Sequence, residues 1–131
     1  MKKVLLVATL LFTFGFVNAQ KVANVEVGGK LKICDLKSNN YTANCRTVES
    51  SGVSVASIGS SKIAIVYNSG KCEVCDIKSN NYTENCRTIE SSGVSNVQMS
   101  GDNRVIVSYD DGKKKACDVK SNNYSANCRS L

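Results

Sequence analysis

A segment of fourteen residues that occurs three times constrains the fold more than any other feature of the chain. Residues 34–47 read CDLKSNNYTANCRT, residues 75–88 read CDIKSNNYTENCRT, and residues 117–130 read CDVKSNNYSANCRS. The copies begin 41 and 42 residues apart, and the similarity continues upstream of each copy without a gap. A period of this length is typical of a supersecondary unit that buries its apolar face against a neighbouring copy. We therefore expect a single repeat domain built from tandem units.

Each complete unit is expected to form four short antiparallel strands. The strand after the first, at residues 63–67 and 105–109, is almost entirely apolar and rich in β-branched side chains, which predicts a strand covered on both faces. A Gly-containing turn follows it, as in a hairpin. The first unit begins at this second strand, so the chain should hold about eleven strands. The approximate units are 20–47, 48–88 and 89–131, and the expected first strands are 54–58 and 95–99.

The segments IAIVYNSGKCEVCDI and VIVSYDDGKKKACDV each read as strand, turn and strand. This pattern, at a period of about 42 residues, resembles the blades of β-propellers. The resemblance implies a four-stranded meander in each unit, although a closed propeller usually has about 4–8 blades. We predict an all-β fold of three tandem antiparallel meander repeats cross-linked by disulfides. A β-trefoil, which is also built from three four-stranded units, is the alternative.

Six of the seven cysteines recur at one spacing, C-x10-C. If Asn39 and Asn40 form the tip of a two-residue turn, Cys34 lies directly opposite Cys45, at a separation that a disulfide can bridge. Cysteines ten residues apart lack the short C-x2-4-C spacing of a zinc site. We therefore predict disulfides and no metal site. The predicted pairs are Cys34–Cys45, Cys75–Cys86 and Cys117–Cys128.

Cys72 has no repeated counterpart, because Leu31 and Lys114 occupy the equivalent positions. Although Cys72 and Cys75 form a C-x-x-C sequence, residues three apart in a strand point to opposite faces, which argues against a redox pair. Two interpretations remain for this unpaired cysteine. It is either a small buried apolar residue or the site of an intermolecular disulfide.

The turn Lys-Ser-Asn-Asn-Tyr is identical in all three units, whereas the first strands differ. Such a turn would supply a repeated binding edge, since Asn, Tyr, Arg and Lys suit sugar hydroxyls, carboxylates and protein surfaces. Good turn chemistry or recent duplication would explain the identity equally well. The candidate binding edge comprises Lys37, Asn39, Asn40, Tyr41, Arg46, Lys78, Asn80, Asn81, Tyr82, Arg87, Lys120, Asn122, Asn123, Tyr124 and Arg129.

The same two-residue turn predicts which residues share a face of the sheet. It pairs Leu36 with Ala43 and leaves a polar face opposite the cysteines. Residues on this predicted polar face are Asp35, Lys37, Thr42, Asn44 and Arg46, with Asp76, Lys78, Thr83, Asn85 and Arg87, and Asp118, Lys120, Ser125, Asn127 and Arg129, at the equivalent positions.

Residues 1–19 have the pattern of a secretory signal peptide. Lys2 and Lys3 precede an apolar run, and Ala19 supplies a small residue at the cleavage site. The run of about 14 residues is short for a membrane span, which needs about 20. An uncleaved anchor is the alternative. We therefore expect the rest of the chain to be secreted or periplasmic, without a membrane span after signal cleavage, in a compartment where disulfides persist.

The composition excludes several kinds of chemistry. The chain has no histidine, which rules out Ser-His-Asp and Cys-His catalysis and any histidine-ligated metal. No nucleotide-binding loop is present, and we expect no cofactor and no nucleic-acid partner. We predict a secreted, non-enzymatic binding or adhesion module whose partner is a glycan or a cell-surface protein. The alternatives are a structural or oligomer-forming envelope protein, a homo-oligomer included, and a hydrolase with two distant carboxylates.

The repeated turns also match the acceptor sequence for N-glycosylation at Asn40, Asn81 and Asn123. In a eukaryotic secretory pathway these asparagines would be candidate glycan sites.

Overall fold

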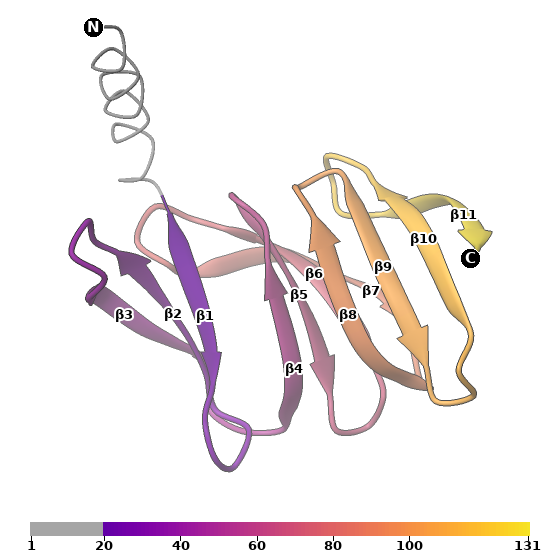
Figure 1. The fold of residues 1–131 in the computed structure, drawn as a ribbon, viewed down its shortest axis with the longest axis horizontal. Coiled ribbons are helices and arrows are strands. Elements are labelled where there is room, and N and C mark those ends of the chain that lie inside the picture. Colours follow the sequence, from indigo (N-terminus) through magenta and orange to yellow (C-terminus); the bar gives the residue numbers. More distant parts are fainter. Residues whose placement is uncertain (1–19) are drawn as a thin grey trace, which may run out of the picture.

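The computed structural model describes residues 20–131, which form eleven strands in three antiparallel sheets (Figure 1). The predicted signal peptide lies outside the described residues. The strands are β1 (Lys21–Val25), β2 (Leu31–Leu36), β3 (Thr42–Glu49), β4 (Val53–Ile58), β5 (Lys62–Tyr67), β6 (Cys72–Ile77), β7 (Thr83–Glu90), β8 (Val94–Ser100), β9 (Arg104–Tyr109), β10 (Lys114–Val119) and β11 (Ser125–Ser130). Residues 20–131 form no helix with the length and apolarity that crossing a bilayer requires.

The strands of each sheet follow one another along the chain. The first sheet has the order β1-β2-β3, the second β4-β5-β6-β7, and the third β8-β9-β10-β11. The prediction of an all-β fold made of tandem antiparallel meanders is confirmed, and the strands form three separate sheets instead of the trefoil alternative. The sheets lie in a row, so that the second sheet has a neighbour on both faces (Figure 1).

Two apolar cores lie between the sheets, one at each boundary. Alternation along β5 divides its side chains between them. Ile63 and Ile65 belong to the core shared with the first sheet, while Ala64 and Val66 belong to the core shared with the third. All four side chains are buried. The continuous apolar pattern of this strand therefore reflects burial on both faces.

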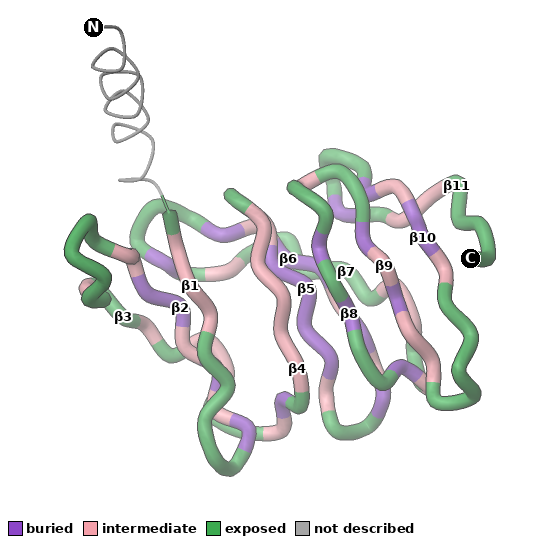
Figure 2. Tube along the Cα trace, viewed as in Figure 1, coloured by how far each residue is buried: buried purple, intermediate pink, exposed green. Residues whose placement is uncertain are grey.

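The outer faces of the row are more polar than the inner ones, and they carry more of the exposed and partly exposed residues (Figure 2). On the third sheet, Ser108 and Lys114 occupy the positions that Val66 and Cys72 hold in the buried core of the second unit. On the first sheet, Asn24 takes the position of Ile65. Terminal units with polar outer faces are what a row of stacked repeats needs to remain soluble.

The turn between β2 and β3 differs from the predicted two-residue turn. The Lys37 N–H donates to Tyr41 O at 2.9 Å, and the Asn40 N–H donates to Lys37 O at 2.9 Å. The loop therefore holds three residues, and only its last, Asn40, has a positive φ, of 66°. A type I turn followed by one left-handed residue satisfies the hairpin, so the chain does not need two left-handed residues. Asn81 and Asn123 have the same conformation.

A β-bulge follows this turn. Asp35 pairs with Ala43 and Ile33 pairs with Arg46, which leaves two residues of β3 opposite Cys34. The first of them, Asn44, has a φ of 55°. The extra residue aligns Cys45 with Cys34 and directs Arg46 toward the second sheet, an effect that bulges commonly have.

The turn and the bulge correct part of the predicted polar face. Leu36 pairs with Thr42 instead of Ala43, so Thr42 lies on the cysteine side. The same correction applies to Thr83, which pairs with Ile77, and to Ser125, which pairs with Val119.

The disulfide prediction is confirmed. The bridges Cys34–Cys45, Cys75–Cys86 and Cys117–Cys128 each join Cα atoms 4.0 Å apart across a hairpin.

Cys72 is a free thiol with no exposed surface, and it belongs to the core between the second and third sheets. Burial, together with Glu90 and Glu73, raises the pKa of this thiol to about 12. An intermolecular disulfide, one of its two interpretations, would therefore require the core to open.

Candidate functional site

The repeated turn of one unit inserts into the unit that precedes it. Asn81, at the turn after β6, is completely buried against the first sheet. Its side-chain amide accepts a hydrogen bond from Lys21 Nζ at 2.6 Å. The same amide donates to Asp35 Oδ1 at 3.2 Å and to Asn44 O at 2.8 Å. Every polar atom of this side chain thus has a partner, as burial demands.

Asp35 is the centre of this first cluster. Its carboxylate accepts hydrogen bonds from Asn44 Nδ2 at 2.8 Å and from Lys21 Nζ at 2.9 Å, in addition to the bond from Asn81. The bond from Asn44, followed by that from Lys21, lowers the pKa of Asp35 to about 2. The carboxylate is therefore ionised at neutral and mildly acidic pH.

The second boundary repeats the arrangement with Asn123, which is also completely buried. Asn123 Nδ2 donates to Asp76 Oδ1 at 3.1 Å and to Asn85 O at 2.8 Å, and its Oδ1 accepts from Lys62 Nζ. Asp76 also accepts from Lys62 Nζ at 2.9 Å. Burial acts to raise the pKa of Asp76, but hydrogen bonds from Asn85, Lys62 and Asn123 outweigh it, and the pKa is lowered.

An arginine and a tyrosine close each boundary at the surface. The guanidinium of Arg46 lies 4.0 Å from the ring centroid of Tyr82 and donates to Asn80 O at 3.0 Å and to the Tyr82 hydroxyl at 3.0 Å. Arg87 lies 4.0 Å from the ring of Tyr124 in the same way. Each stack is a cation–π contact worth about 0.5–1 kcal/mol at an exposed position.

We call each set of these contacts a joint. The first joint consists of Lys21, Asp35, Asn44 and Arg46 of the first unit with Asn80, Asn81 and Tyr82 of the second. The second joint consists of Lys62, Asp76, Asn85 and Arg87 with Asn122, Asn123 and Tyr124. The repeated turn of the second and third units therefore has a structural role: it holds consecutive sheets together.

The joints divide the predicted binding edge. The buried or stacked members Asn81, Asn123, Arg46, Arg87, Tyr82 and Tyr124 belong to the joints. The exposed turn residues of this edge are Lys37, Asn39, Asn40, Tyr41, Lys78, Asn80, Lys120 and Asn122. Of these only Asn80 and Asn122 contribute to a joint, through their backbone oxygens. The three copies of the turn are thus not equivalent, because the first copy belongs to the first sheet of the row and inserts into no described sheet.

Burial also separates the three glycosylation sequons. Asn81 and Asn123 are inaccessible in the folded chain, whereas Asn40 is exposed.

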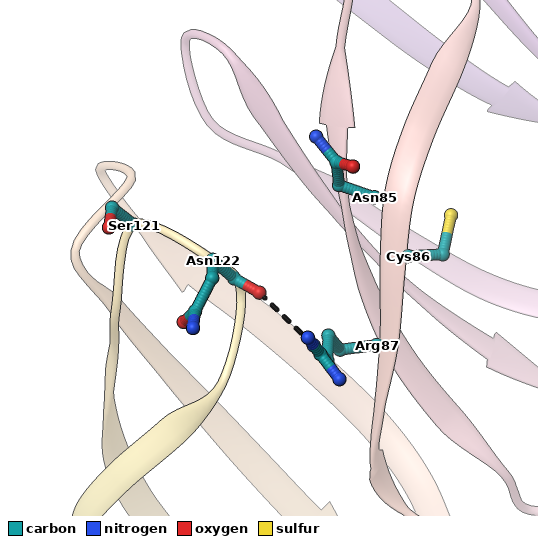
Figure 3. Close-up of a pocket in the computed structure, with 5 residues that line it drawn as sticks. All are labelled: Asn85, Cys86, Arg87, Ser121 and Asn122. Carbon is teal, nitrogen blue, oxygen red and sulfur yellow. Dashed lines mark hydrogen bonds between the residues drawn. The ribbon is translucent and has the colours of Figure 1, made fainter.

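A shallow pocket lies beside each joint. The larger, of about 340 Å³, is lined by Asn85, Cys86, Arg87, Ser121 and Asn122, and Arg87 Nε donates to Asn122 O across it at 3.3 Å (Figure 3). The second, of about 310 Å³, is lined at the first joint by the equivalent residues Asn44, Cys45, Arg46, Ser79 and Asn80. Amide, hydroxyl and guanidinium groups line both pockets, and no carboxylate does. Such a lining suits ligands that carry carboxylates or hydroxyls.

Sequence reasoning missed several residues of the joints and pockets. Lys21 and Lys62 occupy the same position in the aligned units, which was the available signal for their role. Ser79 and Ser121 lie in the repeated turn but were not assigned to the binding edge. The lysines that were assigned to it, Lys37, Lys78 and Lys120, line neither pocket.

One further cluster has the composition of a metal site. Glu73 lies close to the sulfur atoms of Cys75 and Cys86. Because the two sulfurs form a disulfide, they are not available as thiolate ligands.

Comparisons with models of protein families and with curated proteins found no match to this chain.

Proposed function

We propose that this protein is a secreted, non-enzymatic repeat protein that binds carboxylate- and hydroxyl-bearing glycans of cell surfaces at the two pockets beside its joints. The observation that carries the proposal is the repetition of one lining, with an arginine, a serine and two asparagines in each pocket. A lining rich in donors suits the hydroxyls and carboxylates of acidic sugars.

Two features of the chain support export. Residues 1–19 have the pattern of a signal peptide. The described residues contain three disulfides, which are typical of an oxidising compartment. The absence of histidine from the sequence and the lack of a carboxylate in either pocket support binding without catalysis.

Two equivalent pockets on one rigid row favour a repetitive ligand. A polymer that reaches both pockets binds the second one intramolecularly, and the gain in avidity needs no additional contact. Weak binding of a single sugar and much tighter binding of its polymer are therefore expected together.

Binding to an array of acidic and neutral oligosaccharides, followed by calorimetric titration of the best binder, tests the proposal. Ser79→Glu and Ser121→Glu each place a carboxylate in one pocket, so each should reduce the stoichiometry for an acidic sugar from two sites to one. Ser38→Glu is the matched control, because Ser38 has the same place in the first turn but lines neither pocket.

The Ser38→Glu control is titrated at a concentration at which the protein is monomeric. Under this condition the substitution should leave the stoichiometry for the sugar unchanged. Failure of every oligosaccharide to bind, or an equal loss of binding in all three variants, would refute the proposal.

A further inference from the structure

The first unit presents one half of a joint that no described residue engages. Asn40 and Tyr41 correspond to Asn81 and Tyr82, and Asn40 has the same left-handed backbone. Among residues 20–131 no sheet precedes the first one, and both side chains are exposed, Tyr41 by 57%. The turn is therefore already in the conformation that inserts at the two internal joints.

The third unit presents the complementary half. Asn127 Nδ2 donates to Asp118 Oδ2 at 3.0 Å, as Asn44 and Asn85 do to their own aspartates. Arg104 lies 3.7 Å from Asp118 and takes the place of Lys21 and Lys62. The hydrogen bond from Asn127 lowers the pKa of Asp118, so the carboxylate is ionised before any partner arrives.

Arg129 completes this second half. It corresponds to Arg46 and Arg87, which both stack on a tyrosine of the following unit, and it is exposed. Among residues 20–131 no fourth turn reaches Asp118 or Arg129. The two outer faces of the row therefore carry complementary halves of a contact that the chain forms twice within itself.

We propose that two copies of this chain associate head to tail, with Asn40 of the second copy inserting beside Asp118 and Asn127 and with Tyr41 of the second copy stacking on Arg129. The occupant is a second copy because it carries the same turn, in the same conformation, that fills both internal joints. This contact is heterologous, so association gives a ring if the rotation closes and a filament if it does not.

The remaining parts of the outer faces set the strength of this association. The internal boundaries bury apolar cores, whereas the outer faces carry Asn24, Ser108 and Lys114 at core positions. The contact between copies therefore depends mainly on polar hydrogen bonds and the cation–π stack, which gives reversible, concentration-dependent assembly.

Docking would also complete a third pocket. The internal pockets combine an Asn-Cys-Arg segment of one unit with a Ser-Asn pair of the next. In the assembly, Asn127, Cys128 and Arg129 would face Ser38 and Asn39 of the second copy. The site is incomplete without that copy.

Sedimentation velocity of the purified protein, its N-terminus defined by mass spectrometry, tests the proposal from micromolar to millimolar concentration. The wild-type protein should shift from monomer to larger species as its concentration rises. Arg129→Ala and Tyr41→Ala each remove the cation–π contact, which should weaken association by about two- to fivefold. Lys113→Ala and Val27→Ala, at exposed positions outside both halves of the joint, serve as matched controls and should associate as the wild type does.

Mixing the two variants makes the test specific. Arg129→Ala retains an intact first turn and Tyr41→Ala retains an intact last unit, so the mixture should form heterodimers under conditions in which neither variant associates alone. Rings and filaments of the wild type both support the proposal. A wild type that stays monomeric at the highest concentration, or a mixture that stays monomeric, would overturn it. Because no sugar is present, this result is independent of the proposed ligand binding.

Discussion

Three asparagines with the same backbone conformation differ only in what surrounds them. Asn40, Asn81 and Asn123 have φ values of 66°, 68° and 68°, but only the last two are buried in a preceding unit. Replacing each by alanine therefore imposes a similar backbone cost, because alanine lacks the short polar side chain with which asparagine favours the left-handed conformation. Any difference between the variants reports the insertion alone.

Asn81→Ala should therefore destabilise the protein by about 2 kcal/mol more than Asn40→Ala, because Lys21, Asp35 and the Asn44 carbonyl each lose a hydrogen bond at a partly buried site. Urea denaturation of the three single variants measures this difference, and Asn123→Ala should behave like Asn81→Ala. Equal losses in all three variants would contradict the structural role of the joints.

The carboxylate of Asp35 links the stability of the first joint to pH. Its pKa is about 2 in the folded protein, against 3.8 for an unperturbed aspartate, so the folded state favours the ionised form. A lowered folded pKa gives stability that is fully present above the unfolded pKa and lost as the pH falls through the folded one. The melting temperature of the wild type should therefore decline between about pH 4 and pH 2. The Asp35→Asn variant should have a lower melting temperature than the wild type at pH 4, and its melting temperature should decline less between about pH 4 and pH 2.

Cys72 should react slowly in the native state, because its thiol is buried and its pKa is raised to about 12. Alkylation by iodoacetamide at pH 8, followed by mass spectrometry, should label no cysteine in the native protein and one cysteine in denaturant without reductant. Rapid labelling of the native protein would show that the core between the second and third sheets opens readily.

The hairpin with its bulge is the element that makes the joint possible. The bulge at Asn44 brings Cys45 opposite Cys34 and directs Arg46 toward the next unit. A hairpin without the extra residue would present a different set of side chains to the second sheet, since a shift of one residue exchanges the faces of a strand. The disulfide and the joint thus depend on one irregularity.

Removing the disulfide of the middle unit tests how much each hairpin relies on its cross-link. Each bridge joins cysteines 11 residues apart. In the chain-entropy account, closing a loop of this size stabilises the folded state by about 3 kcal/mol, because it restricts the unfolded chain. Cys75→Ala combined with Cys86→Ala should lower the free energy of unfolding by about that amount, and by more than the corresponding pair at Cys34 and Cys45, because Cys75 lies in a core between two sheets. Equal losses would indicate that loop closure alone accounts for the effect.

The sequence alone predicted the elements better than their details. Alternation and turn chemistry located the first two strands of the second and third units to within one residue at each end, and the spacing of the cysteines identified the disulfides. The bulge was missed because an extra asparagine in a strand has no periodic signature of its own. The joints were missed because Asn81 and Asp35 are 46 residues apart, and three identical turns conceal the fact that only two of them have a preceding unit to enter.

At the scale of the whole molecule, the middle sheet is the most protected part of the chain. β5 contributes side chains to both cores, whereas the first and third sheets each have an outer face with polar residues. Native-state hydrogen exchange should therefore be slowest in β5 and β6 and faster in the outer sheets. Uniform protection across all three sheets would indicate that the row opens only as a single unit.

The joints have a consequence for how a molecule of this design can change its length. Residues 48–88 carry a turn that enters the unit before it and a carboxylate cluster that receives the turn of the unit after it. A tandem duplication of this stretch would bring both matching surfaces with it, so the enlarged protein would need no compensating substitutions elsewhere. The number of units is in this sense a heritable variable that a single recombination event can alter.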